Sequence, residues 1–454
     1  MNRIARRTAI TLLLSVLLVA GLAFFLAEFA FEAEDWVLFE GSPHVYNGSS
    51  IGCGSVTDRE GQLLLDMEDG RVYAESAVLR MSTVHWLGDR NGNISAPALT
   101  HYSAELSGFD LLNGVYSYGE TSAIATLTLS AKAQIAALEA LGDAHGTVAV
   151  YNYETGELLC AVSTPTFDPN DPPQLSEDNE SRYDGLYVNR FTQGRYIPGS
   201  IFKIVTLAAA LETRPELLDQ NFVCTGSYAI GADEIVCEDP HWDQSLKDAF
   251  RNSCNCAFAQ ISQILGQNTL QRYVDQFAVN AEMTFDGITT TEGNFDLTDA
   301  EELSAAWSSI GQHKDLINPC AFLQFVGAVA REGKGVQPYI VEEIRIGGTS
   351  TYRARSQTRE RIMSASTAQT VKEFMRNNVQ TKYGDENFPG LNVCAKTGTA
   401  EVGADKKPNA MLAGFVDNPD IPLAFIVCVE NGGYGSTTCI PIASKVLAVC
   451  ADGL

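Results

Sequence analysis

A helix that is apolar on nearly every side constrains this chain most, because such a helix is stable only at the centre of a domain. The pattern predicts it over residues 201–211, directly after a Pro198-Gly199 turn. Ser200 and Lys203 stand three residues apart at its start and therefore share one face of its first turn. Burial lowers the pKa of a lysine, so its neutral amine can take the proton of a neighbouring hydroxyl. The stretch thus predicts a nucleophilic serine with a lysine base, although Ser-x-x-Lys alone also occurs by chance.

Length and composition indicate a folded protein with a large core. The chain has 454 residues, of which 45% are hydrophobic and 19% charged, and this predicts two soluble parts and an anchor. The net charge of −25 argues against a nucleic-acid binder, which needs basic patches to meet phosphates.

The N-terminus carries a predicted membrane anchor. An uncharged apolar run from Thr8 to Ala27 has about the length that spans a bilayer as a helix. Basic residues precede the run and acidic residues follow it, which places residues 1–7 in the cytoplasm, an anchor at 8–30 and the remainder outside the membrane. A cleaved signal peptide is the alternative, but the run is long for one and no lipobox cysteine follows.

The remainder divides by texture into two predicted parts. Residues 36–140 form a small β-rich module with turn signals and no nucleophile or metal cluster, so a pedestal or dimerisation-like module, with a spacer or docking role, is expected. Residues 144–454 begin with a predicted hairpin (146–153 and 156–163), continue with helices and end with strands and a helix. This order predicts one α+β domain, an antiparallel sheet flanked by helices and closed by both chain ends. The other predicted elements are helices at 244–252, 256–265, 301–310, 320–330 and 441–451 and strands at 391–395, 411–416 and 423–429.

Two further motifs follow the serine and lysine in a fixed order. They are Ser253-x-Asn255 and Lys396-Thr-Gly-Thr399. Alone, the first is most simply a helix N-cap and the second a solvated turn. Together with Ser200-x-x-Lys203, the set resembles the signature of penicillin-binding proteins and serine β-lactamases.

The flanking sequence extends this resemblance. The chain resembles the monofunctional (class B) penicillin-binding proteins, which are membrane-anchored peptidoglycan D,D-transpeptidases, closely over 144–450 and loosely over 36–140. Its layout resembles the smaller penicillin-binding protein A-type members. The flanks that carry the likeness are Ser163-Thr-Pro-Thr-Phe-Asp-Pro-Asn170, Ser308-Ser-Ile-Gly-Gln312, Asn318-Pro319 and Ala413-Gly-Phe415.

The resemblance implies catalytic roles for five residues. Ser200 attacks the carbonyl between two D-alanines of a stem peptide and forms an acyl-enzyme. Lys203 is its base, kept neutral by burial and by the positive charge of Lys396. Ser253 relays a proton to the leaving amine, and Asn255 holds the amide backbone of the substrate.

It also implies a binding strand. Lys396, Thr397 and Thr399 receive the terminal carboxylate, and Gly398 allows close approach of the substrate. The backbone N–H groups of Ser200 and Thr399 form the oxyanion hole. No cofactor is required for catalysis. The amine of a second stem peptide then takes the acyl group and forms a crosslink, and β-lactams acylate the same serine.

Other functions share this scaffold. A β-lactamase would usually be shorter and soluble, with a group poised for deacylation; a D,D-carboxypeptidase would use water as acceptor. A β-lactam sensor would need more membrane spans or a cytoplasmic effector. The N-terminal part is too short for a glycosyltransferase, so the resemblance implies a polytopic SEDS-family glycosyltransferase as partner. Whether the complex serves septation, elongation or sporulation is not readable from the sequence.

Cysteines around the second motif suggest a metal. The chain has eleven cysteines, an odd number without disulfide-framework spacing. Cys224, Cys237, His241 and Cys254 form a C-x12-C-x3-H-x12-C pattern, and thiolates with an imidazole are good zinc ligands. Some class B relatives carry a structural metal beside the Ser-x-Asn segment. A structural zinc ion is therefore one hypothesis, and a Cys224–Cys237 disulfide and plain free thiols are the alternatives.

Overall fold

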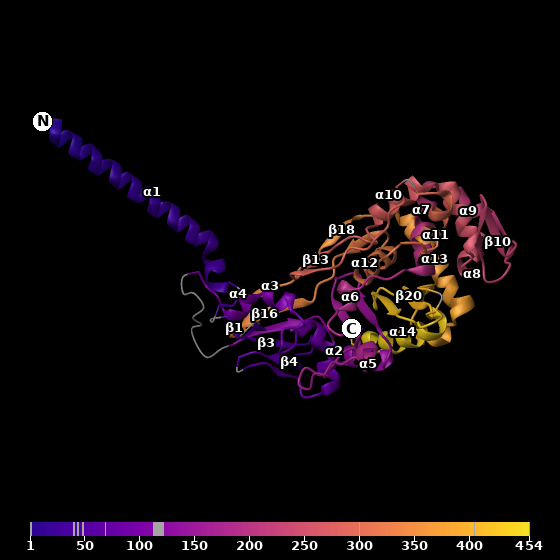
Figure 1. Ribbon diagram of the computed structural model, residues 1–454, viewed down its shortest axis with the longest axis horizontal. Coiled ribbons are helices and arrows are strands. Elements are labelled where there is room, and N and C mark those ends of the chain that lie inside the picture. The colour runs from indigo at the N-terminus through magenta and orange to yellow at the C-terminus, as the bar shows by residue number, and fades with distance from the viewer. Residues whose placement is uncertain are drawn as a thin grey trace.

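A computed structural model describes residues 2–39, 41–42, 45–47, 50–68, 70–111, 122–298, 300–403 and 405–453. A single long helix, α1 (Asn2–Leu38), projects from one end of the molecule (Figure 1). Among the described residues it is the one helix long and apolar enough to cross a membrane, with a mean hydropathy of 2.7 in its most apolar window. The predicted apolar helix is thus confirmed.

The N-terminal module is built around a six-stranded sheet in the order β17-β16-β6-β3-β4-β5. Among the described strands of this sheet, β3 and β6 are the one parallel pair. The strands are β3 (Ser55–Thr57), β4 (Leu63–Asp66), β5 (Val72–Tyr73), β6 (Ala123–Leu127), β16 (Val341–Ile346) and β17 (Thr349–Arg353), and a separate ribbon joins β1 (Tyr46–Asn47) to β2 (Ser50–Ile51). Two of the six strands thus come from a hairpin far along the chain, which the sequence did not predict.

Helices complete this module and connect it to the rest. They are α2 (Ala77–Leu87), α3 (Pro97–His101), α4 (Ser103–Ser107) and α5 (Ala131–Leu141). Arg80 of α2 donates two hydrogen bonds to the Asp168 carboxylate, from Nε to Oδ1 at 2.8 Å and from Nη2 to Oδ2 at 2.5 Å. The Trp86 indole donates to the Ala161 carbonyl at 2.7 Å. One hydrophobic core runs through both parts of the molecule.

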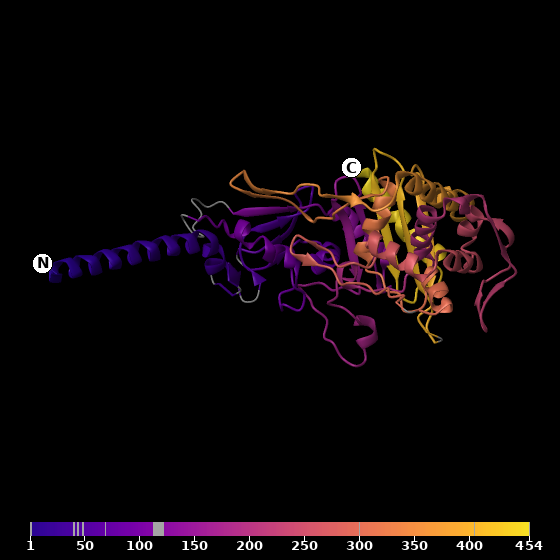
Figure 2. The ribbon, with the colours of Figure 1, turned by 90° about the horizontal axis from the view of Figure 1, so that it is seen from above.

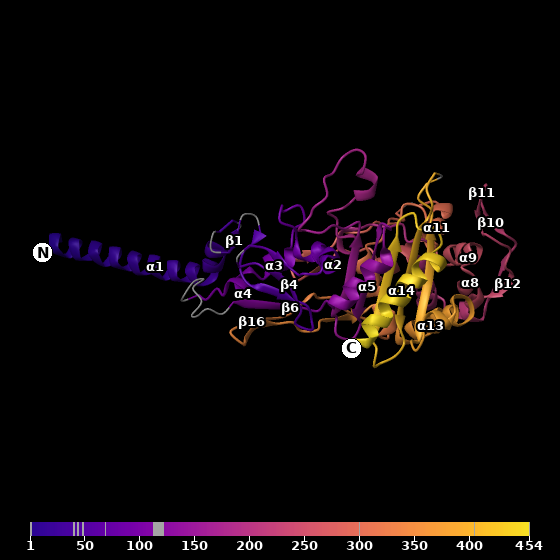
Figure 3. The ribbon, with the colours of Figure 1, turned by 90° about the horizontal axis from the view of Figure 1, so that it is seen from below.

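The larger part is built on an antiparallel five-stranded sheet in the order β19-β20-β21-β7-β8. The strands are β7 (Gly146–Asn152), β8 (Leu158–Thr164), β19 (Val393–Ala400), β20 (Asn409–Val416) and β21 (Leu423–Val429). Early strands therefore pair with late ones, which confirms the predicted closure by both chain ends. Helices α14 (Gly435–Asp452) and α5 cover one face (Figure 3).

The other face carries the helical middle of the chain. The predicted central helix is α7 (Lys203–Thr213), buried over 203–211, and α12 (Pro319–Ala330) is buried along its whole length. The other helices are α6 (Arg190–Gln193), α8 (Leu246–Asn252), α9 (Asn255–Leu265), α10 (Gln267–Phe277), α11 (Glu302–Ser309) and α13 (Ala365–Asn378). The predicted helix at 244 begins two residues later because Ser245 caps it, with its hydroxyl accepting from Asp248 N–H.

Short helical turns and ribbons fill the connections. Single turns are η1 (Glu180–Tyr183), η2 (Gly199–Phe202), η3 (Pro215–Asp219), η4 (Val379–Tyr383) and η5 (Asp385–Asn387); the segment containing η1 projects from the side of the sheet (Figure 2). The ribbons pair β9 (Asn221–Cys224) with β12 (Trp242–Ser245), β10 (Ser227–Ile230) with β11 (Asp233–Val236), β13 (Thr284–Phe285) with β14 (Ile288–Thr289), and β15 (Lys334–Val336) with β18 (Thr358–Arg361). The first two ribbons lie at the end of the molecule opposite α1 (Figure 3).

Candidate active site

Ser200 lies in η2, the single turn that leads into α7, on the face of the sheet opposite α14. Gly199 before it has φ +55°, and a Cβ there would lie 2.6 Å from the Thr399 carbonyl oxygen. Only glycine therefore lets this turn pack against β19. Lys203 follows at the start of α7 and is fully buried, with Nζ 3.0 Å from Ser200 Oγ.

Lys203 is the centre of a hydrogen-bond cluster. Its Nζ lies 2.7 Å from the Ser253 carbonyl oxygen, 3.1 Å from Ser253 Oγ and 2.7 Å from Asn255 Oδ1. Burial, with a smaller contribution from the positive charge of Lys382, lowers the pKa of Lys203 to about 7, against the opposing effect of nearby cysteines. A large fraction of the amine is therefore neutral at physiological pH, as a base requires.

The Ser253-Cys254-Asn255 segment is the junction between α8 and α9. Ser253 takes the left-handed conformation (φ 57°) as the C-cap of α8, and Cys254 caps α9. A left-handed residue other than glycine costs about 1–2 kcal/mol, so the surrounding contacts must hold Ser253 in place. Its Oγ contacts both lysines, at 3.1 Å from Lys203 Nζ and 3.0 Å from Lys396 Nζ.

Lys396, Thr397, Gly398 and Thr399 all lie within strand β19, not in a turn. Lys396 is fully buried, and burial followed by the charges of Lys203 and Lys382 lowers its pKa. The charge of Lys203 thus lowers the pKa of Lys396, whereas the main causes of the shift at Lys203 are burial, the nearby cysteines and Lys382, and the predicted effect of Lys396 is not among them. At Gly398, a Cβ would lie 2.9 Å from the Pro198 carbonyl oxygen, so the chain itself requires this glycine.

The structure brings all eight predicted catalytic and substrate-binding residues to one place and adds two others. Tyr383 is buried in η4, where its hydroxyl lies 3.0 Å from Thr397 Oγ1 and accepts the Thr397 N–H at 3.1 Å. Lys382 precedes it. The η4 segment is a single π-helical turn. No local residue pattern predicts such a turn, so the sequence did not single out these two residues.

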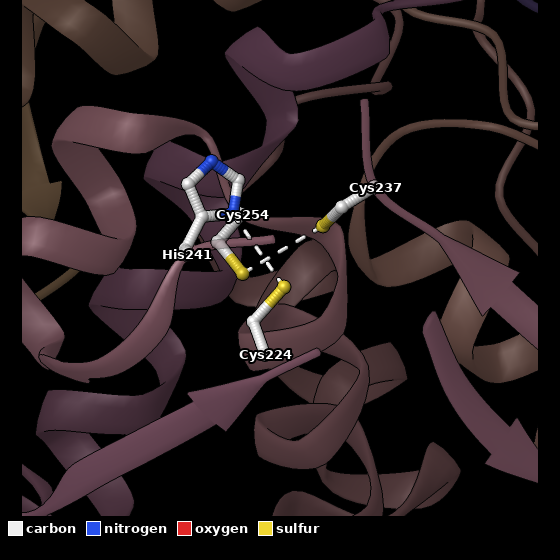
Figure 4. Close-up of side chains that lie close together, drawn as sticks. All are labelled: Cys224, Cys237, His241 and Cys254. Atoms are coloured by element: carbon white, nitrogen blue, oxygen red, sulfur yellow. Dashed lines mark hydrogen bonds between the residues drawn. The ribbon is translucent and has the colours of Figure 1, made fainter. Parts of the chain in front are cut away.

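The predicted metal ligands also converge. Sulfur and nitrogen atoms of Cys224, Cys237, His241 and Cys254 all lie within 4.8 Å of one another (Figure 4). Cys224 Sγ is 3.5 Å from His241 Nδ1, and Cys237 Sγ is 3.7 Å from Cys254 Sγ. All eleven cysteines are free thiols, so the alternative Cys224–Cys237 disulfide is absent from the described chain.

Backbone N–H groups donate hydrogen bonds to sulfur atoms of this cluster, and such bonds stabilise thiolates. The N–H groups of Asn255 and Cys256 donate to Cys237 Sγ at 3.1 and 3.3 Å, and Ala257 N–H donates to Cys254 Sγ at 3.4 Å. Hydrogen bonds from the neighbouring thiols and this backbone lower the pKa of Cys237. The donor set therefore fits a tetrahedral zinc ion.

Comparison with known proteins identifies the family to which this chain belongs. The chain matches the penicillin binding protein transpeptidase domain over residues 146–448. It therefore belongs to the penicillin-binding protein transpeptidase family, and the predicted membership of the class B proteins is confirmed.

Individual relatives agree in fold and layout. The chain is 28% identical to the peptidoglycan D,D-transpeptidase PbpA of Mycolicibacterium smegmatis, over 71% of each chain. It is 28% identical to the stage V sporulation protein D of Bacillus subtilis, over 66% of this chain and 48% of that protein. Among solved structures, the D,D-transpeptidase domain of a peptidoglycan glycosyltransferase from Eggerthella lenta has TM-score 0.75 and 25% identity, covering 88% of this chain and 98% of that one. The penicillin G acyl-enzyme of Mycobacterium tuberculosis penicillin-binding protein A has TM-score 0.74 and 23% identity, covering 89% and 100%.

Proposed function

We propose that Ser200 is the nucleophile of the D,D-transpeptidase reaction of this penicillin-binding protein. The protein is a peptidoglycan D,D-transpeptidase and a serine acyltransferase, as predicted from the sequence. The observation that supports Ser200 most directly is its contact with the buried Lys203, whose amine has a pKa of about 7.

In the first half of the reaction, the neutral amine of Lys203 takes the Ser200 proton while Oγ attacks the carbonyl carbon between two D-alanines. The backbone N–H groups of Ser200 and Thr399 stabilise the oxyanion. The C–N bond then breaks, and the Ser253 hydroxyl, which contacts both lysines, passes a proton to the leaving nitrogen. D-alanine departs and an ester to Ser200 Oγ remains.

The strand β19 positions the substrate for this attack. Lys396 and the hydroxyls of Thr397 and Thr399 bind the terminal carboxylate, and Asn255 orients the amide backbone. In the second half, the amine of a neighbouring stem peptide attacks the ester carbon, a new peptide bond forms, and the proton returns to Ser200 Oγ through Lys203.

Labelling with a fluorescent penicillin tests the nucleophile. The full chain in detergent is compared with Ser200→Ala and with Ser176→Ala, a control in the segment before η1. We expect lasting label on the native chain and the control and none on Ser200→Ala. Label that fades within minutes would favour a β-lactamase, and no label at all on the native chain would contradict the proposal.

We further propose a structural zinc ion held by Cys224, Cys237, His241 and Cys254. Its chemistry is structural, joining β9 and the segment around His241 to the start of α9. Three sulfur donors, one imidazole and the N–H···S bonds support this choice of metal.

Metal analysis of the purified chain tests the ion. We expect about one zinc per chain, its loss in Cys224→Ser, and retention in the control Cys53→Ser. If the ion adds a few kcal/mol of folding free energy, chelation lowers the melting temperature by about 5 °C or more. The site would be contradicted if the purified native chain held no zinc and its melting temperature did not change on addition of chelator.

The basic N-terminus and the apolar helix α1 support a single-pass arrangement in the membrane. Arg3, Arg6 and Arg7 favour a cytoplasmic N-terminus and an extracytoplasmic catalytic domain. The division into 36–140 and 144–454 is retained, with hairpin β16–β17 contributed to the first part by the second. A SEDS-family glycosyltransferase is proposed to contact α1 and the N-terminal module. Protease added to intact spheroplasts should digest the catalytic domain, and a protected domain would contradict this orientation.

A further inference from the structure

A third lysine acts on the active site besides Lys203 and Lys396. The positive charge of Lys382, from η4, lowers the pKa of both. The whole chain has a net charge of −25, so this gathering of cations is not part of a generally basic surface. It is a local feature that calls for a local cause.

The backbone of Lys382 is tied to the strand that we propose binds the terminal carboxylate. The next residue, Tyr383, is buried and contacts Thr397 through both the side chain and the backbone N–H of that threonine. The π-turn that contains both residues is a rare geometry often found at functional sites. Lys382 is therefore held beside the substrate strand.

No carboxylate of the described residues lies within ion-pair distance of the Lys382 ammonium group. Among the described residues its contact is the Arg251 carbonyl oxygen at 3.4 Å, at the end of α8, and it forms no ion pair. Partial desolvation lowers the pKa of Lys382, the negative charge of Glu238 raises it, and the charge of Arg251, the smallest of the three effects, lowers it. Arg251 itself pairs with Asp248 at 3.0 Å.

A structural role explains only part of this arrangement. A cation near the C-terminus of a helix is favourable by about 0.3–1 kcal/mol, which accounts for the contact with Arg251. This interaction with the helix end does not explain why the Lys382 ammonium lies where its charge repels Lys203 and Lys396. An anion shared with these cations would offset that repulsion.

We propose that Lys382 is a specificity-determining residue that binds a second carboxylate of the donor stem peptide, on a residue before the D-Ala-D-Ala end. This inference rests on the proposed roles of Ser200 and Lys396. Lys396 takes the terminal carboxylate, and Lys382 takes the inner one. Because the ammonium lies at the surface, it is a point charge that a flexible peptide can reach.

Two penicillins that differ by one carboxylate provide a matched test. Carbenicillin is benzylpenicillin with a carboxylate added to its acyl side chain, which stands where the inner part of a stem peptide lies. Acylation rate constants for both are measured on the full chain, Lys382→Gln, Lys382→Arg and Lys445→Gln. Lys445 pairs with Glu139 on the far side of the sheet, so its variant controls for the loss of one charge.

We expect Lys382→Gln to lower the carbenicillin rate about 5- to 10-fold and the benzylpenicillin rate less than about 2-fold. Lys382→Arg should restore the difference, and Lys445→Gln should leave both rates unchanged. Equal losses for both penicillins, or a common shift of both pH profiles, would show that Lys382 only tunes Lys203 and would overturn the proposal. Unchanged rates would overturn it too. Failure of the native chain to react with either penicillin would instead contradict the role of Ser200.

Discussion

Lys203 Nζ lies 3.0 Å from Ser200 Oγ, which joins a fully buried amine to a half-buried hydroxyl. The amine is fully buried, and its remaining hydrogen bonds go to the Ser253–Asn255 segment. The relationship is a consequence of the fold. A central helix presents the two residues on one turn, and a helix junction closes over them.

The pH dependence of acylation follows from this pair. The pKa of Lys203 is lowered from 10.5 to about 7, so the neutral base is depleted below that pH and abundant above it. We expect the acylation rate by benzylpenicillin to rise with pH, to be half-maximal near pH 7 and to level off above pH 8. Lys203→Arg should lose about 10²–10⁴-fold of the rate at every pH, since a guanidinium stays charged. A flat profile in the native chain would contradict the role of Lys203 as base.

Tyr383 is predicted to be a positioning residue. Tyr383→Phe removes the hydroxyl of a buried tyrosine, which accepts the N–H of the half-buried Thr397, at a cost of about 1 kcal/mol. We expect weaker β-lactam binding before acylation and about 3- to 10-fold slower overall acylation, with little change in the chemical step. Tyr228→Phe, which loses an exposed contact with Gln263, is the matched control. A fall in the chemical step alone would contradict a positioning role.

Gly398 is predicted to be required by the chain rather than by the substrate. A Cβ at this position would lie 2.9 Å from the Pro198 carbonyl oxygen and 3.1 Å from Ile201 Cγ2. Gly398→Ala should therefore lower the free energy of unfolding by about 1–3 kcal/mol and shift η2. Gly335→Ala, where the nearest atom would lie at 3.7 Å, should change stability by less than about 1 kcal/mol. Denaturant titration of both variants measures this, and equal stabilities would refute the packing argument.

Local patterns predicted the parts of the site that depend on local chemistry. The apolar run around Ile204 predicted the central helix. The residue types and spacing of Cys224, Cys237, His241 and Cys254 predicted their cluster. These elements could be predicted because helical period and ligand type are written in neighbouring residues.

The parts that were missed depend on pairing between distant segments. The hairpin of Val341–Arg353 alternates like a strand pair, but nothing in it identifies β6 as its partner, so the N-terminal sheet could not be assembled. Lys382 and Tyr383 lie in a turn without sequence signals, and their role arises only from contact with Thr397 and the two buried lysines. The positive φ of Ser253 could not be predicted either, because it depends on contacts with distant residues.

In the proposed reaction, Ser200 transfers the acyl group of one stem peptide to the amine of another. The most direct measurement incubates the full chain with a stem-peptide thioester donor and D-alanine as acceptor amine, then follows protein and products by mass spectrometry. We predict an acyl adduct on the peptide containing Ser200 and an aminolysis product that grows with acceptor concentration, both absent in Ser200→Ala. An adduct on another residue, or hydrolysis alone at every acceptor concentration, would contradict the account.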